Sequence, residues 1–151
     1  MDARSLLRRT EAAGSVGELG SDLCWKVLES TTLGRLAVAT DEGVEIFPLN
    51  FVVDGTSIYF RTAPGAKLSA VAAHPNVALE VDGVDPDGET AFSVVVKGAA
   101  ERLDLPADID EAESLHLTPW TATRKLRWVR IRPREVTGRV FRLGPEPSTY
   151  V

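Results

Sequence analysis

The chain has 151 residues, enough for one domain with a full core, and its 44% apolar and 26% charged residues suit a globular protein. Its 17 basic and 22 acidic residues give a net charge of −5, which argues against non-specific binding to nucleic acid or an anionic membrane. The single cysteine, Cys24, excludes an internal disulfide and paired-thiolate metal sites. The sequence has neither an apolar run of the roughly 20 residues that span a bilayer nor a secretory signal, so we expect a cytoplasmic protein.

The first part of the chain predicts a flexible arm, a short helix and then strands. The arm covers residues 1–20, and the helix is expected to be capped by Ser21 and to end near Ser30. Three strands of an antiparallel meander are then predicted at 33–40, 44–53 and 57–61, with turns at Asp41-Glu42-Gly43 and Asp54-Gly55.

The second part predicts more strands around two short helical segments. We expect a helix at 67–73, strands at 77–81 and 90–103 with a bulge at Gly98, a helical turn near 110–115, and a last strand pair at 126–132 and 135–143 turned at Pro133. Residues 144–151 are expected to form an irregular tail. Six or seven strands at hairpin spacing favour a closed or partly closed antiparallel barrel over residues 21–143.

The loop after the third predicted strand has the residue types of a phosphate site. Arg61 ends the strand, Gly65 follows a proline in a turn, and Lys67 opens a helix. A phosphate is bound well by cationic donors together with backbone N–H groups at a helix start. The alternative is a surface turn with two solvated cations.

Several short motifs resemble those of one known family. They are Leu33-Gly-Arg-Leu-Ala-Val38, Phe47-Pro-Leu-Asn-Phe-Val-Val-Asp-Gly55, Ile58-Tyr-Phe-Arg-Thr62, Gly65-Ala-Lys-Leu68, Leu79-Glu-Val-Asp82, Ser93-Val-Val-Val-Lys-Gly98 and Thr137-Gly-Arg139. In this order the chain resembles the pyridoxamine 5′-phosphate oxidase-like family, within its subgroup of short flavin-nucleotide-binding or nitroimidazole-resistance-like proteins.

The resemblance implies a mainly β fold, a six-stranded antiparallel split β-barrel with short flanking helices. It also implies a homodimer with flavin mononucleotide (FMN) at the subunit interface. Carried over by position, the cofactor-binding residues are Pro48, Leu49, Asn50, Arg61, Thr62, Gly65, Lys67 and Leu68. No catalytic residue and no metal ligand is assigned. For Asn50 the alternative is a side chain that pairs with strand backbone, and Glu80 and Asp82 are interpreted as interface or solvent-facing carboxylates.

Three functional hypotheses follow from the resemblance. The first is an FMN-dependent oxidoreductase acting on a small molecule, with the deazaflavin F420 as an alternative cofactor whose acidic tail Arg130 and Arg132 could bind. The second is a non-catalytic protein that binds flavin or haem, with His74 and His116 as the candidate haem ligands. The third is a dimeric scaffold without a cofactor. The alternative for the basic C-terminal strand is a solvated face.

Overall fold

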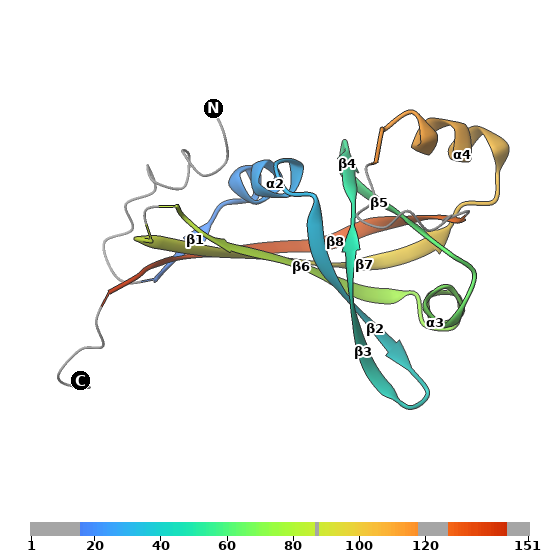
Figure 1. Ribbon diagram of the computed structural model, residues 1–151, viewed down its shortest axis with the longest axis horizontal. Coiled ribbons are helices and arrows are strands. Elements are labelled where there is room, and N and C mark those ends of the chain that lie inside the picture. Colours follow the sequence, from blue (N-terminus) through green and yellow to red (C-terminus); the bar gives the residue numbers. More distant parts are fainter. Residues whose placement is uncertain (1–15, 87, 118–126, 145–151) are drawn as a thin grey trace.

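One curled antiparallel sheet with three short helices around it forms the structure, a computed structural model that describes residues 16–86, 88–117 and 127–144 (Figure 1). The elements are β1 (Val16–Leu19), α2 (Ser21–Glu29), β2 (Leu33–Thr40), β3 (Gly43–Asn50), β4 (Val52–Asp54), β5 (Ser57–Thr62), α3 (Ala66–Ala73), β6 (Asn76–Val84), β7 (Thr90–Arg102), α4 (Pro106–Glu113) and β8 (Arg127–Arg142). The sheet order is β3-β2-β6-β7-β8-β5-β4, and β1 also pairs with β8. The predicted mainly β split barrel is confirmed, with eight strands in the sheet instead of six.

The inner face of the sheet carries the main hydrophobic core. Side chains alternate along each strand, so that Leu36 and Val38 of β2 and Leu79 and Val81 of β6 are fully buried while their neighbours face outward. Helix α2 packs against β4, β7 and β8, and α3 packs against β2 and β7. No helix in the described ranges is long and apolar enough to cross a membrane.

The bulge predicted at Gly98 is confirmed. The register between β7 and β8 shifts between Lys97 and Gly98, where Gly98 lies opposite Pro133. A Cβ atom at Gly98 would overlap the backbone carbonyl of Arg132, so the close approach of the two strands requires glycine. The bend that barrels need is therefore built into the longest strand pair.

The predicted single strand at 44–53 is wrong, and so is the meander. Strands β3 and β4 lie at opposite ends of the sheet order, because the chain leaves one edge at Phe51 and crosses to the other. Phe51 is 1% exposed, and its N–H donates to the carbonyl of Thr32 at 3.1 Å. The burial of this ring stabilises the crossing. The Asp54-Gly55 hairpin joins β4 to β5 as predicted, with Gly55 at φ 59°.

The predicted strand pair turned at Pro133 is also wrong, because β8 is one continuous strand. Pro133 lies at the bulge opposite Gly98, a position that tolerates a missing backbone N–H group. Strand β8 pairs with β7, β5 and β1. A single continuous strand therefore connects these three strands within the sheet.

Three smaller differences concern the helices and the N-terminal end of the described residues. Residues 16–19 of the predicted arm form β1, paired with residues 138–141 of β8. Gly20, without a side-chain cap, takes the N-cap position expected for Ser21. Helix α4 begins earlier than the predicted helical turn, with a proline in its first turn. The rest of the arm, residues 1–15, and residues 145–151 of the tail lie outside the described residues.

Candidate functional site

The loop between β5 and α3 presents open backbone at the start of a helix. Helix α3 begins after Gly65 without a side-chain cap. A Cβ atom at Gly65 would meet nothing within 4 Å, so the surroundings of this backbone are open. Thr62 is 6% exposed, and its hydroxyl donates to the carbonyl of Ala63 at 3.2 Å. The uncapped first turn of α3 can thus receive an anion.

Lys67 lies in this first turn and is held over an aromatic ring. Its ammonium nitrogen is 4.9 Å from the ring centroid of Phe47, which packs against the main core. The next residue, Leu68, is 9% exposed and belongs to that core. Leu68 therefore anchors the helix while Lys67 stays half-buried at the rim of the barrel.

Arg61 lies on the other face of β5. Its guanidinium carbon is 5.2 Å from the ring centroid of Trp128, and Nη2 donates to the carbonyl of Leu117 at 3.1 Å. Trp128 belongs to a second hydrophobic cluster beneath α4, whose buried members are Tyr59, Leu103, Ala112 and Trp128. In this structure the side chains of Arg61 and Lys67 thus contact different hydrophobic clusters.

The three predicted site residues of β3 differ in their exposure. Pro48 is exposed and lies opposite Arg35 of β2. Leu49 and Asn50 are each 7% exposed. Nδ2 of Asn50 donates to the carbonyl of Thr32 at 3.1 Å, which is the backbone pairing that we considered as the alternative for this residue. Of the three side chains, Pro48 is the one that a ligand can reach.

The basic C-terminal strand is partly neutralised by one carboxylate. Oε1 of Glu101 is 2.7 Å from Nη2 of Arg130 and 3.0 Å from Nε of Arg132. The hydrogen bond from Arg130, together with the charges of both arginines, lowers the pKa of Glu101. These two guanidinium groups are therefore engaged within the sheet.

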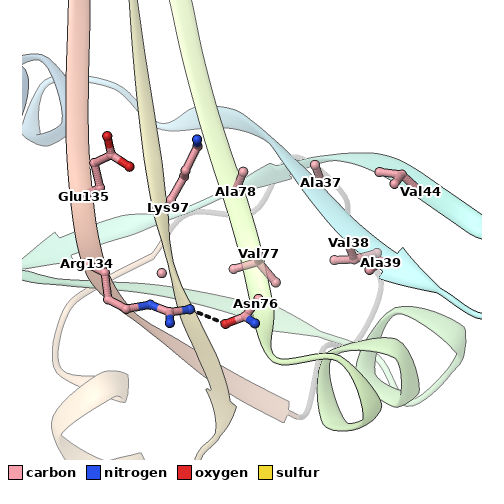
Figure 2. A pocket seen from close by; sticks show the side chains of 11 residues that line it. Ala37, Val38, Ala39, Val44, Asn76, Val77, Ala78, Lys97, Arg134 and Glu135 are labelled. Atoms are coloured by element: carbon pink, nitrogen blue, oxygen red, sulfur yellow. Dashed lines mark hydrogen bonds between the residues drawn. The ribbon is translucent and has the colours of Figure 1, made fainter.

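The outward face of β2, β3 and β6, which we call the outer face, is apolar and hollowed (Figure 2). The hollow has a volume of about 470 Å³ and is lined by Ala37, Val38, Ala39, Val44, Asn76, Val77, Ala78, Lys97, Gly98, Arg134 and Glu135. The lining residue Val44 is 72% exposed, and Ile46, which follows it on the same face of β3, is 66% exposed. At its polar end Arg134 donates a hydrogen bond to Asn76. Sequence reasoning missed this face, because the alternation in β3 does not show which side is covered.

A charged cluster lies farther along the same face. Nη1 of Arg35 is 3.1 Å from Oε2 of Glu80 and 3.3 Å from Oδ1 of Asp82. Burial raises the pKa of Glu80, and the neighbouring Asp82 raises it further against the opposing effect of Arg35. The side chains of Glu80 and Asp82 are 31% and 52% exposed, so both carboxylates reach solvent in this structure.

The two histidines lie in different surroundings, and neither belongs to a group of residues that could bind a metal ion among the described residues. Nε2 of His74 is 3.1 Å from Oδ1 of Asp41, which ties the β2–β3 turn to the end of α3. His116 is exposed and has a positive φ of 56°. Within the described parts of the chain no group of three or more His, Cys, Asp or Glu residues could hold a metal ion.

The curled sheet with its bulged central strands and uncapped β5–α3 loop defines a split-barrel protein. The family model for pyridoxamine 5′-phosphate oxidase matches residues 20–140, so the chain belongs to this family, and the resemblance seen in the motifs is confirmed.

Three solved structures are similar to the chain over most of its length. A Corynebacterium glutamicum protein assigned as a pyridoxamine 5′-phosphate oxidase is 40% identical with a TM-score of 0.79, covering 89% of this chain and 99% of its own. A Mycobacterium smegmatis FAD-binding protein is 38% identical with a TM-score of 0.70, covering 83% of this chain and 98% of its own. A Mesorhizobium loti FAD-binding protein is 29% identical with a TM-score of 0.74, covering 83% of this chain and 97% of its own.

Proposed function

We propose that this protein binds a flavin nucleotide and uses it to oxidise or reduce a small organic molecule. The observation that carries the proposal is the similarity, over 83% of the chain in each case, to the FAD-binding proteins of Mycobacterium smegmatis and Mesorhizobium loti. Membership of the pyridoxamine 5′-phosphate oxidase family supports it. When bound, the flavin supplies the hydride and electron transfer, while the protein provides position and electrostatics.

The cofactor phosphate is proposed to bind at the first turn of α3. Lys67 supplies a positive charge there, and the N–H groups of the uncapped first turn supply further donors. The open backbone at Gly65 leaves room for the ligand to approach. The exposed side chain of Pro48 is proposed to lie along the cofactor, whereas Leu49, Asn50, Thr62 and Leu68, which are buried, would contribute through backbone atoms or by supporting the loop.

FMN is the cofactor expected from the sequence, and the two similar proteins bind FAD. Both nucleotides contain riboflavin 5′-phosphate, and we propose that the site is built for this shared part. F420 is less favoured, because Arg130 and Arg132 already share Glu101.

Titration of the purified protein with FMN, FAD and F420, followed by absorbance and by quenching of flavin fluorescence, tests the proposal. Saturable binding of FMN or FAD supports it, and the absence of binding to both flavins contradicts it. Oxidoreductase activity is tested separately, by oxidation of NADH or NADPH with the flavin-loaded protein and an organic acceptor.

A second copy of the chain is the proposed partner, seated on the outer face. Contiguous exposed apolar surface of this kind marks interaction sites in soluble proteins. Val44, at the hollow, and its neighbour Ile46 are exposed, and the hollow is lined in part by small side chains, those of Ala37, Ala39 and Ala78. On a self-complementary face, the projecting residues of each copy could fill the hollow of the other.

A further inference from the structure

Two carboxylates on β6 share one guanidinium group, an arrangement that we call the Arg35 cluster. Glu80 and Asp82 are two residues apart on the strand, so their side chains project from the same side of the sheet. Nη1 of Arg35, on the neighbouring strand β2, lies within ion-pair distance of both. Among the described residues no other cation lies within that distance of either carboxylate. When both carboxylates are ionised, the cluster therefore has one negative charge in excess.

The strands around the cluster do not balance this excess charge. On β7 the residues opposite the two carboxylates are the uncharged Val95 and Ser93, and on β3 the residue opposite Arg35 is Pro48. Charged residues farther along the same side of the sheet are Lys97, Arg134, Glu135, Arg139 and Glu18. At the end of α3, which packs against β2, His74 pairs with Asp41 of the β2–β3 turn and not with the cluster.

The cluster is continuous with the outer face on which a second copy is proposed to sit. Arg35 lies on the same side of β2 as Ala37, and Glu80 lies on the same side of β6 as Ala78, and both alanines line the hollow. In the single chain, water still reaches both carboxylates of the cluster. A second copy would remove this water from charges that do not cancel, which is costly. Protonation of one carboxylate leaves a cluster without net charge.

We propose that self-association through the outer face takes up protons at the Arg35 cluster, so that the dimer is more stable in mildly acidic than in neutral or alkaline solution. This inference rests on the partner named in the proposed function, a second copy of the chain, and it adds the regulation of that contact. The chemistry is the transfer of a proton from solvent to a carboxylate of each cluster. No residue of the flavin site takes part in it.

The direction of the pH effect follows from the charge of the cluster. In the single chain, burial and the neighbouring Asp82 already raise the pKa of Glu80 against the effect of Arg35. Removal of the remaining water in the dimer raises it further. The form with the higher pKa binds the proton more tightly, so association strengthens as the pH falls through the pKa of the dimer and levels off below that of the single chain.

Sedimentation velocity of the purified chain, from mildly alkaline to mildly acidic pH, measures the dissociation constant of the dimer. We expect this constant to fall roughly tenfold or more from neutral to mildly acidic pH, because the dimer contains two clusters. Glu80→Gln removes the excess charge and keeps an oxygen that accepts from Arg35. This variant should dimerise at neutral pH as tightly as the unaltered protein does in acid, with little further dependence on pH. Glu111→Gln, on the exposed side of α4, is the matched control and should keep the full pH dependence.

Two further variants test the cluster from its other members. Arg35→Gln leaves two carboxylates without their cation, so its dimer should be weaker than that of the unaltered protein at neutral pH and should recover in acid. Asp82→Asn, at a side chain 52% exposed, removes the same excess charge as Glu80→Gln. It should have the same effect, and it replaces Glu80→Gln if that variant does not fold.

Three results would overturn the inference. The first is a dissociation constant of the unaltered dimer that does not change with pH, and the second is a dimer that weakens in acid. The third is a full pH dependence in both Glu80→Gln and Asp82→Asn, which would assign the effect to another group, such as His74 with its partner Asp41.

The outcome also separates this inference from the proposed function. A dimer whose dissociation constant is independent of pH leaves the proposed partner and the flavin site in place, and only the inference fails. If the unaltered protein is monomeric at every pH, or if Ile46→Glu dimerises as the unaltered protein does, the outer face is not the interface and the proposed partner fails as well. Flavin titration at a fixed pH tests the flavin part of the proposed function independently.

Discussion

Lys67 of α3 lies over the ring of Phe47 in β3, with 4.9 Å between its ammonium nitrogen and the ring centroid. This contact joins the start of the helix to a strand at the edge of the sheet. It holds a positive charge at the point where the backbone of α3 is uncapped.

Removing the positive charge of Lys67 should weaken the binding of the cofactor. We expect Lys67→Gln to raise the Kd for FMN or FAD by roughly tenfold or more, because a charge-assisted hydrogen bond contributes about 1.5–3 kcal/mol. Isothermal titration calorimetry measures the change. Lys26→Gln, on the exposed face of α2, is the control and should bind flavin as the unaltered protein does. Equal affinities in the two variants would place the phosphate elsewhere.

A charge on the outer face should disrupt the proposed dimer. Ile46→Glu puts a carboxylate where a second copy would have to desolvate it, so the variant should be monomeric in light scattering coupled to size-exclusion chromatography. Leu105→Glu is a matched control, because Ile46 and Leu105 are both 66% exposed and Leu105 lies at the start of α4, away from this face. If both variants have the mass of the unaltered protein, the outer face is not the interface.

The β7–β8 bulge predicts that substitution of Gly98 strongly reduces the stability of the protein. Gly98→Ala should lower the free energy of unfolding by about 1–3 kcal/mol, because the new methyl group meets the backbone of Arg132, which can move little inside the sheet. Urea denaturation gives the difference. Gly144→Ala, where a Cβ atom meets nothing within 4 Å, should change stability very little. A stability for Gly98→Ala equal to that of this control would mean that the strands separate easily here.

The ion pairs of Glu101 predict a stability that depends on pH. Since folding lowers the pKa of Glu101, its contribution is present above the ordinary pKa of a glutamate and is lost as the pH falls through the folded value. Glu101→Gln should therefore be less stable than the unaltered protein at neutral pH, with a difference that shrinks in acid.

Thermal unfolding measured from neutral to acidic pH checks this expectation. Glu42→Gln, in the exposed β2–β3 turn, is the control and should follow the unaltered protein throughout. A deficit of Glu101→Gln that stays constant over the whole range would show that the loss is one of packing and not of charge.

Local signals in the sequence predicted much of the sheet. The strand at 33–40, the Asp54-Gly55 turn and the bulge at Gly98 depend on side-chain alternation and glycine geometry, which neighbouring residues determine. The errors at 44–53 and at Pro133 have another origin. Whether Phe51 ends a strand, and whether a proline turns the chain or occupies a bulge, depends on which distant strand lies opposite.

The secondary-structure elements around the candidate site were predictable from the sequence, and the directions of the side chains on them were less so. The turn and helix around Lys67 follow from Gly65 and the apolar spacing of α3. That Arg61 faces Trp128 depends on the placement of α4 and β8 across the sheet, and the spacing of two cations along the chain contains no such information. The outer face was missed for the same reason.

The pairing of β1 with β8 has a consequence for how the protein is made. Residues 16–19 of β1 pair with residues 138–141 of β8, and β5 and β7 also pair with β8. All three strands therefore need β8 for these hydrogen bonds. The sheet can therefore close only after the ribosome has synthesised β8, and such distant contacts slow folding and leave strand edges exposed meanwhile. Stalled or truncated chains that lack β8 should be aggregation-prone clients of chaperones.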